Sequence, residues 1–404
     1  MSHHTSNSNS MRNVNELPER ADVVVVGGGV IGLAAARELA RRGAEVVLIE
    51  RGETGAEASW AAAGMLAPQV EADCADEFFA LASASRDLYP AFARELEEES
   101  GIDIELDRTG TLYLAFTEED EEEAERRHAW QTRAGLQVER LTAREVHELE
   151  PQVSARVRSA LRFPLDGQVE NRRLVAALAL SLATRGVSVV THTQVTAINV
   201  EDGRAVGVET ARGTTRAASA IVIACGAWSS LVPRREVSSM RTGSDTTCPR
   251  IEPVRGQILC YAPAQPPLVR HVVYSPRGYI LPRRDGRLLA GTTTEHAGFD
   301  KSLTDAGRLA ITAHAQEIAP AVAGLTLQDA WAGLRPRAPD DWPVIGACRD
   351  VANLFYATGH YRNGILLAPL TGALVAGLIL GDGTVPDMLR AFTLERNARA
   401  SCAV

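Results

Sequence analysis

The chain of 404 residues has few of the features that mark a disulfide-stapled, metal-binding or membrane-spanning protein. Its six cysteines are scattered along the sequence without a Cys-x-x-Cys pair or a nearby histidine cluster, which argues against a disulfide framework or a zinc site. No apolar run reaches the roughly 18 residues that a membrane-spanning helix needs. We therefore expect no metal and no stable membrane association.

Positive charge is also in short supply, because 42 basic residues face 51 acidic ones and the formal net charge is −9. A net acidic surface repels phosphates, so we expect no nucleic-acid partner. Net charge does not exclude a local cationic pocket. The first 20 residues are polar and lack the apolar segment of a signal peptide, so we expect a disordered tail and a cytoplasmic protein.

The first ordered part of the chain predicts a complete strand–helix–strand unit. The β-branched run at 21–26 is typical of a strand buried on both faces, as in a parallel sheet. Residues 33–43 are rich in helix-forming residues and end at a glycine. Residues 44–50 predict a second buried strand.

Three glycines between the first strand and the helix carry the dinucleotide-binding pattern. Gly27 permits a tight turn, Gly29 lets the backbone approach a pyrophosphate, and Gly32 lets the helix pack closely on the strand. The helix N-terminus at Val30 and Ile31 would face the phosphates. The pattern predicts a dinucleotide site but leaves FAD and NAD both open.

Glu50 ends the second strand, where a carboxylate accepts hydrogen bonds from a ribose. A carboxylate at this place disfavours a 2′-phosphate, so we do not expect NADP. Further along, residues 171–186 and 365–380 predict strong helices, and the charge run at 118–133 predicts a solvated surface helix.

Five further strings decide between the cofactors. They are ASWAAAGMLAP at 58–68, IVIACGAWS at 221–229, YILPR at 279–283, WAGLRP at 331–336 and GHYRNGILLAPLTG at 359–372. In this order they resemble the FAD-dependent amine oxidases of the D-amino-acid oxidase type over about residues 21–396. Within that family the chain is most similar to the members that oxidise glycine for thiamine biosynthesis.

The resemblance implies an α/β fold (α+β overall), with a Rossmann-like FAD-binding domain and an inserted antiparallel-sheet substrate domain. It divides the chain into a disordered tail at 1–20, an FAD-binding domain at 21–100, 165–232 and 331–404, a substrate-binding domain at 101–164 and 250–330, and an exposed insertion at 233–249.

By resemblance, FAD binds non-covalently and in an extended form. The residues implied to contact it are Gly27, Gly29, Val30, Ile31, Gly32, Glu50, Arg51, Ala58, Ser59, Ala63, Gly64, Met65, Val195, Gly226, His360, Tyr361, Arg362, Asn363, Gly364, Ile365 and Leu366. The segment from His360 to Leu366 is placed at the isoalloxazine ring. A helix that begins at Gly364 would stabilise the negative charge that develops there on reduction.

The substrate carboxylate needs a cationic partner, and the planar fork of arginine suits it. The resemblance assigns this role to Arg335, with Tyr279 as a hydroxyl donor and Arg362 as a second substrate-site residue. We expect no protein base, because the amine reacts in its neutral form.

The implied reaction is oxidative deamination of glycine, with sarcosine and small D-amino acids as further substrates. A hydride passes to flavin N5, and O₂ reoxidises the flavin and yields H₂O₂. The imine is hydrolysed to glyoxylate and ammonia or passed to thiazole-synthesis enzymes, and a homo-oligomer is expected. The alternatives are a D-amino-acid dehydrogenase that feeds a quinone, a sarcosine oxidase-like enzyme with cysteine-linked FAD, and a non-catalytic FAD-binding subunit.

Three residues depart from the family pattern. Trp60 stands where a small polar residue is usual, so its indole must point away from FAD or repack the loop. Arg277, two residues before Tyr279, would lie on the same strand face. Together with Thr294 it would open or polarise the substrate pocket.

Overall fold

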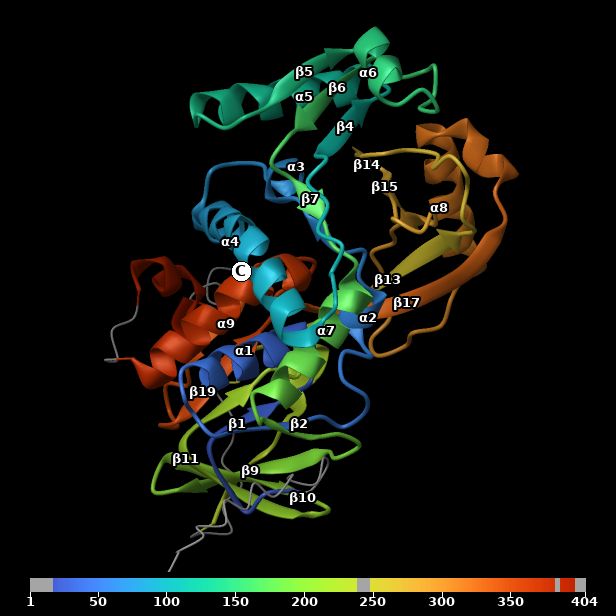
Figure 1. Cartoon of the computed structure of the whole chain (residues 1–404). Coiled ribbons are helices and arrows are strands. Elements are labelled where there is room, and N and C mark those ends of the chain that lie inside the picture. The colour runs from blue at the N-terminus through green and yellow to red at the C-terminus, as the bar shows by residue number, and fades with distance from the viewer. Residues whose placement is uncertain (1–16, 238–247, 382–385, 397–404) are drawn as a thin grey trace, which may run out of the picture.

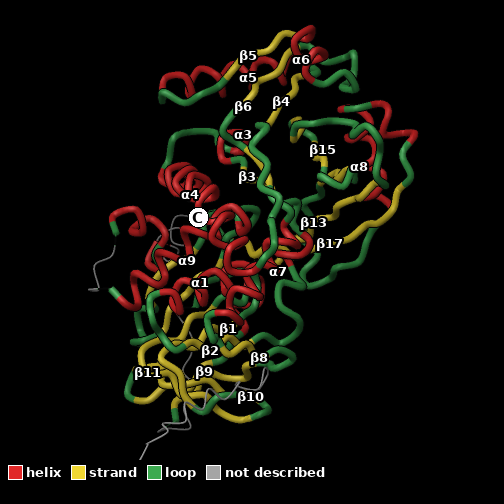
Figure 2. The backbone as a smooth tube through the Cα atoms, viewed as in Figure 1, coloured by secondary structure: helices red, strands yellow, loops and turns green. Residues whose placement is uncertain are grey.

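The computed structural model describes residues 17–237, 248–381 and 386–396. Within these residues, two large sheets stand apart (Figure 1), and helices α1 (Val30–Arg41), α7 (Asn171–Thr184) and α9 (Gly364–Leu380) lie between them. Figure 2 shows strands towards both ends of the molecule with α1, α7 and α9 between them, while further helices lie beside the strands of the upper end.

The first sheet is built around β1 (Arg20–Val26), which pairs in parallel with β2 (Val46–Ile49) and β11 (Gly213–Ile223). Its order in the described chain is β12-β9-β10-β11-β1-β2-β8, and β19 and β18 extend from β11. The remaining bounds are β8 (Ser188–Val190), β9 (Val195–Glu201), β10 (Arg204–Thr210), β12 (Arg234–Glu236), β18 (Val344–Ala347) and β19 (Leu354–Thr358).

The two faces of β1 are both buried, as its continuous apolar run predicts. Val23 and Val25 pack with the helices α1, α7 and α9 in one core cluster. Val24 and Val26 pack with side chains of β9 and β10 in another, so the antiparallel strands cover the face that the helices leave. This burial fixes the end of β1, from which the nucleotide-binding turn leaves.

The glycine pattern after β1 has the steric role that the sequence predicts. Gly27 has a φ of +110°, and a Cβ there would lie 2.4 Å from the carbonyl oxygen of Ala224. A Cβ at Gly32 would lie 1.9 Å from the carbonyl oxygen of Gly27. Helix α1 can therefore rest on the β1 turn only while position 32 has no side chain.

The second sheet has the order β17-β13-β16-β15-β14-β4-β6-β5 and is antiparallel except where β14 and β4 pair in parallel. Its bounds are β4 (Thr111–Ala115), β5 (Glu139–Thr142), β6 (Ser159–Phe163), β13 (Glu252–Tyr261), β14 (Val272–Ser275), β15 (Gly278–Pro282), β16 (Leu288–Gly291) and β17 (Leu327–Arg337). All of β17 belongs to this sheet. The expected start of the last FAD-binding segment, residue 331, therefore lies inside a strand of the second sheet.

Helix α8 (Asp305–Ile318) covers one face of the second sheet through a cluster that includes Ile280 and Ile311. The opposite face carries Tyr279 and Trp331, which pack against Ala61 and Ala63. The segment that follows β2 therefore lies against the second sheet, and it joins the two halves of the structure.

The remaining elements are α2 (Ala58–Ala61), α3 (Pro68–Glu71), α4 (Glu77–Ser100), α5 (Glu118–Arg133), α6 (Ala143–Leu149), the short pair β3 (Met65–Leu66) and β7 (Gly167–Gln168), and the 3₁₀ turns at Gly226–Leu231, Pro320–Gly324 and Asp387–Phe392. The charged run forms α5, which begins with a capping box between Thr117 and Asp120.

The boundaries of several sequence-based expectations need correction. The sequence predicts strands over 103–116, but only Thr111–Ala115 of this stretch forms one, β4. The insertion expected at 233–249 begins with β12, which pairs in parallel with β9 at the edge of the first sheet. The rest of that insertion at 238–247, and the expected tail at 1–16, lie outside the described residues.

In the part of the chain that the structure describes, no helix is both long and apolar enough to span a bilayer. The same residues contain no cluster of three or more histidine, cysteine or carboxylate side chains that is suited to a metal ion.

Gly32→Ala tests the packing of α1 on the β1 turn. We expect the free energy of unfolding of the apoprotein to fall by about 2 kcal/mol, because an overpacked methyl must displace backbone. Gly324→Ala is the matched control, since a Cβ there meets nothing within 4 Å, and we expect a change below about 0.5 kcal/mol. Denaturant unfolding of both variants measures the difference, and equal stabilities would contradict this role of Gly32.

Candidate active site

Two cavities meet along the segment that follows β2. One, the substrate cavity, is lined by residues of β13, β15 and β17 and by the residues that precede α9. The other, the nucleotide cavity, is lined by the ends of β1 and β2 and by the start of β9. Ala58, Ser59 and Gly226 line both cavities, so the two form one extended site.

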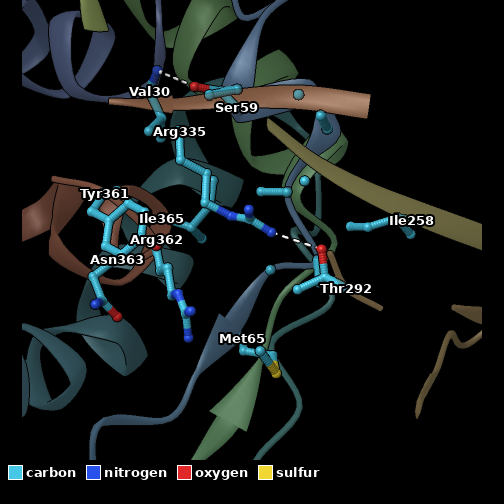
Figure 3. A pocket seen from close by; sticks show the side chains of 18 of the residues that line it. Val30, Ser59, Met65, Ile258, Thr292, Arg335, Tyr361, Arg362, Asn363 and Ile365 are labelled. Carbon is cyan, nitrogen blue, oxygen red and sulfur yellow. Dashed lines mark hydrogen bonds between the residues drawn. The ribbon is translucent and has the colours of Figure 1, made fainter. Parts of the chain in front are cut away.

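The nucleotide cavity has the features that an extended dinucleotide requires. Helix α1 has Gly29 at its N-cap and no side-chain cap, so its N-terminus is directed to the cavity. The amide N–H of Val30 donates to Ser59 Oγ over 3.0 Å (Figure 3). Glu50, at the end of β2, accepts hydrogen bonds from Gly28 N at 2.6 Å and Gly52 N at 2.9 Å.

A second helix N-terminus opens into the substrate cavity. Asn363 is the N-cap of α9 without a side-chain capping bond, and Asn363, Gly364 and Ile365 line the cavity. His360 is only 2% exposed and hydrogen-bonds Thr371 Oγ1 through Nε2 at 3.1 Å. Burial lowers the pKa of His360 to about 3, so the imidazole is neutral and contributes no charge here.

Arg335 projects from β17 into the substrate cavity (Figure 3). Its guanidinium donates to Thr292 Oγ1 at 2.7 Å and to the carbonyl oxygen of Thr293 at 3.1 Å. A Cβ at Gly256, on the neighbouring strand β13, would lie 2.1 Å from the guanidinium. The glycine therefore creates the space in which Arg335 lies.

Burial lowers the pKa of Arg335 below its ordinary value, and Arg362 acts in the same direction. Arginine nonetheless stays charged in proteins. Among the described residues it forms no ion pair with a carboxylate, and its hydrogen bonds go to neutral oxygens. A half-buried, charged fork without an ion-paired carboxylate is suited to bind the carboxylate of a ligand.

Tyr279 reaches the same cavity from β15 and is 6% exposed. It lies opposite Gly291 in the strand pair, and a Cβ there would be 2.4 Å from the tyrosine hydroxyl. Burial raises the pKa of Tyr279 to about 12, although Arg335 acts in the opposite direction. The phenol therefore remains protonated and available as a hydrogen-bond donor.

Arg362 enters the cavity from the segment before α9 (Figure 3), and Glu71 enters it from α3. Burial raises the pKa of Glu71, whereas Arg362 and Arg335 oppose the rise. Burial alone would lower the pKa of Arg362, but Glu71 and neighbouring tyrosines raise it above its ordinary value. Both arginines thus act on the Glu71 carboxyl, and the effect of Arg362 is the larger of the two.

Most of the cofactor residues expected from the sequence line one of the two cavities. Those at the nucleotide cavity are Gly27, Gly29, Glu50, Arg51, Ala58, Ser59, Val195 and Gly226. Those at the substrate cavity are Val30, Ala58, Ser59, Ala63, Gly64, Met65, Gly226, Tyr361, Arg362, Asn363, Gly364 and Ile365. In the described chain, Ile31, Gly32, His360 and Leu366 lie outside both linings and are buried instead.

Sequence reasoning missed several residues of the cavity wall, namely Glu71, Gly256, Ile258, Tyr274 and Thr292. The local sequence around them carries no signal, because each reaches the cavity through strand register or the placement of α3. The Gly-Thr-Thr turn at 291–293 gives the one local indication, but Thr292 lines the cavity and Thr294, the residue that the sequence analysis names, does not.

Two of the residues that depart from the family pattern, Arg277 and Thr294, do not line the substrate cavity in the described chain. Arg277 precedes β15 and is held outside by Asp120 at 2.9 Å and Glu317 at 2.7 Å, so the strand alternation that would align it with Tyr279 ends before it. Thr294 is exposed, while Thr292 faces the cavity. Neither residue opens or polarises the substrate pocket.

Of the two arrangements expected for Trp60, the structure shows the first, in which the indole points away from the cavity instead of repacking the loop. The Arg172 guanidinium lies 3.6 Å from the centre of its ring, and the ring of Trp331 meets it edge-on at 5.4 Å. The indole is 39% exposed, and its neighbours Ala58, Ser59 and Ala61 line the cavity. The large residue is accommodated on the outer side of the loop.

The chain belongs to the FAD dependent oxidoreductase family, whose model matches residues 22–378. This confirms the resemblance inferred from the sequence strings, and it confirms FAD as the cofactor. The chain is 38% identical to a glycine oxidase of Geobacillus kaustophilus over 384 residues, which cover 94% of this chain and 98% of that one.

A crystal structure of glycine oxidase from Geobacillus kaustophilus superimposes with a TM-score of 0.85 at 36% identity and covers 93% of this chain and 99% of that chain. This confirms the predicted fold class. The chain is also 34% identical to a bifunctional protein ThiO/ThiG of Synechocystis sp., over 93% of this chain and 54% of that protein.

The cysteines support non-covalent attachment of FAD. Among the described residues, no cysteine lines the substrate cavity, and Cys348, which precedes the α9 segment, is 6% exposed in the core below the first sheet. Cys225 lines the nucleotide cavity, but burial raises the pKa of its thiol to about 12. A protonated thiol is a weak nucleophile.

We therefore expect denaturation of the holoprotein to release all of its flavin. Filtration of the denatured protein, followed by absorbance measurements on filtrate and retentate, checks this expectation. Flavin retained with the polypeptide would contradict it and would favour the cysteine-linked alternative.

Proposed function

We propose that the chain oxidises glycine, with sarcosine and small D-amino acids as further substrates, and passes the electrons to O₂. The observation that carries the proposal is the half-buried guanidinium of Arg335, which has no carboxylate ion-pair partner among the described residues and shares a cavity with the Tyr279 hydroxyl and the N-terminus of α9. The similarity to glycine oxidases over nearly the full length of both chains supports glycine as the main substrate.

The two side chains of the second sheet would hold the substrate. Arg335 binds the carboxylate through its fork, and the protonated Tyr279 donates a further hydrogen bond. Because both project from strands of one sheet, their spacing is rigid, and they orient the substrate Cα–H toward the cofactor face of the cavity. Arg362, close to Glu71, completes the polar side of the cavity.

FAD, when bound, supplies the acceptor for the hydride from the substrate Cα. The N-terminus of α9 lines the cavity where negative charge develops, and its free amide groups would stabilise that charge. In the net reaction, glycine, O₂ and water yield glyoxylate, ammonia and H₂O₂. The expectation that no protein base takes part stays a prediction, and it can be tested on Glu71, a carboxyl side chain that lines the cavity.

The similarity to glycine oxidases disfavours the D-amino-acid dehydrogenase, and the substrate cavity of Arg335 and Tyr279 disfavours a non-catalytic FAD-binding subunit. A relative that is named as a fusion with ThiG supports delivery of the imine to thiazole synthesis. We infer a cytoplasmic homo-oligomer that works beside thiazole-synthesis enzymes.

The central test is O₂ consumption with glycine, sarcosine, D-alanine and D-proline, while H₂O₂ is measured in parallel. We expect the highest kcat/KM with glycine and one H₂O₂ for each O₂ consumed. Reduction of a quinone or dye in the absence of O₂ uptake would instead establish a dehydrogenase.

Arg335→Ala tests the carboxylate site. We expect KM for glycine to rise about 100-fold, because two charge-assisted hydrogen bonds are lost, while the FAD content is retained. Arg337→Ala is the matched control, since Arg337 lies on the same strand but is ion-paired with Asp341 at 2.5 Å outside the cavity. Steady-state kinetics on both variants measure the effect, and an unchanged KM in Arg335→Ala would refute the assignment.

A further inference from the structure

Arg283 is a buried cation that the proposed reaction does not use. It follows directly after β15, the strand that carries Tyr279, and is 5% exposed. It does not line the substrate cavity in the described chain. A buried arginine needs several hydrogen-bond acceptors. One acceptor of Arg283 lies on the segment that lines the cavities, and the others lie at residues 168–171.

The guanidinium of Arg283 contacts the loop that lines both cavities. Nη2 donates to the carbonyl oxygen of Ala63 at 2.8 Å and to Asn171 Oδ1 at 3.0 Å, and Nη1 donates to the carbonyl oxygen of Val169 at 2.8 Å. Ala63 itself lines the substrate cavity. One side chain therefore links the strand of Tyr279 to the loop that is placed against the flavin.

Asn171 extends the link along the same loop. Its Nδ2 donates to the carbonyl oxygens of Ser59 at 2.8 Å and Trp60 at 2.9 Å. Val169 N donates to the carbonyl oxygen of Gly64 at 2.9 Å, and a Cβ at Gly64 would lie 2.1 Å from the carbonyl oxygen of Val169. The loop is thus fixed at both ends to the segment that Arg283 also holds.

The charge of Arg283 is balanced by Glu170, which does not line the substrate cavity in the described chain. Its Nε lies 3.0 Å from Glu170 Oε2, an electrostatic contact without hydrogen-bond geometry. Burial lowers the pKa of Arg283, and Glu170 opposes this change. With a further bond from Nη1 to Gln168 Oε1 at 3.4 Å, the planar fork reaches four acceptors at once, which the point charge of a lysine cannot do in the same geometry.

We propose that Arg283 is a positioning residue that fixes the flavin-contacting loop at 58–65 relative to the strand that carries Tyr279. It touches neither substrate nor cofactor. The substrate ligands Arg335 and Tyr279 stay in place without it, because both belong to the second sheet. Loss of Arg283 therefore displaces the loop at 58–65, while Arg335 and Tyr279 keep their positions.

This arrangement predicts a specific split between binding and turnover. In Arg283→Lys, we expect the dissociation constant for FAD to rise at least about tenfold and kcat for FAD-saturated enzyme to fall about ten- to a hundredfold, because small misplacements of reacting groups slow catalysis strongly. KM for glycine changes less than about threefold. The kinetic part rests on the proposed glycine oxidation.

Arg284→Lys is the matched control. The adjacent Arg284 is ion-paired with Asp103 at 2.5 Å, and its side chain is 54% exposed. We expect wild-type FAD affinity, kcat and KM for this variant. FAD titration of the apoproteins by flavin fluorescence gives the affinities, and anaerobic stopped-flow reduction of the FAD-saturated enzymes gives the rate of the chemical step.

Wild-type FAD affinity and wild-type flavin reduction in Arg283→Lys would overturn the inference, and so would a lowered melting temperature as its only effect. If Arg283→Lys does not fold, Asn171→Ser removes the bonds to Ser59 and Trp60, and unchanged FAD affinity in that variant would also overturn it. If the wild-type protein does not oxidise glycine, the proposed function fails, while the FAD titrations still decide the role of Arg283.

Discussion

Arg335 is a cation that the fold half-buries without pairing it with a carboxylate among the described residues, and the other parts of the substrate cavity are arranged around it. Its two hydrogen bonds go to a hydroxyl and a carbonyl oxygen, which orient the guanidinium but leave its charge uncompensated. Glu71 is near enough to influence Arg335 but has Arg362 as its main partner. The cavity therefore gains most from a ligand that supplies one carboxylate, as an amino acid does.

The segment between residues 58 and 65 brings the two halves of the site together. It lies against the second sheet through Ala61 and Ala63, and it lines the nucleotide cavity through Ala58 and Ser59. Small side chains along it permit both contacts at once. Because Arg335 and Tyr279 come from a different part of the chain than this segment, the bonds between these parts determine how the two cavities lie relative to each other.

Local sequence predicted those parts of the structure whose physical cause is local. The turn at Gly27, the helix that starts at Val30 and the long apolar helix α9 follow from residues adjacent in the chain, and the structure has all of them. Arg335 and Tyr279 were expected from motifs, and the structure brings both into one cavity.

The parts that sequence reasoning missed depend on register and on distant contacts. Gly256 matters because strand pairing places it beside Arg335, and Glu71 matters because α3 is held near α9. Arg277 was misplaced because carboxylates from α5 and α8, remote in sequence, attract it away. No spacing along the chain encodes such neighbours.

The absence of a side chain at Gly256 also limits how this site can evolve or be redesigned. Any larger residue at position 256 would occupy the space of the Arg335 guanidinium. The effect of a substitution at position 256 therefore depends on the residue at position 335. A single substitution of Gly256 would displace the Arg335 guanidinium, which is proposed to bind the carboxylate. Routes to new substrate specificity are open instead at Met65 and Ile258, which border the cavity and whose side chains form no hydrogen bond with Arg335.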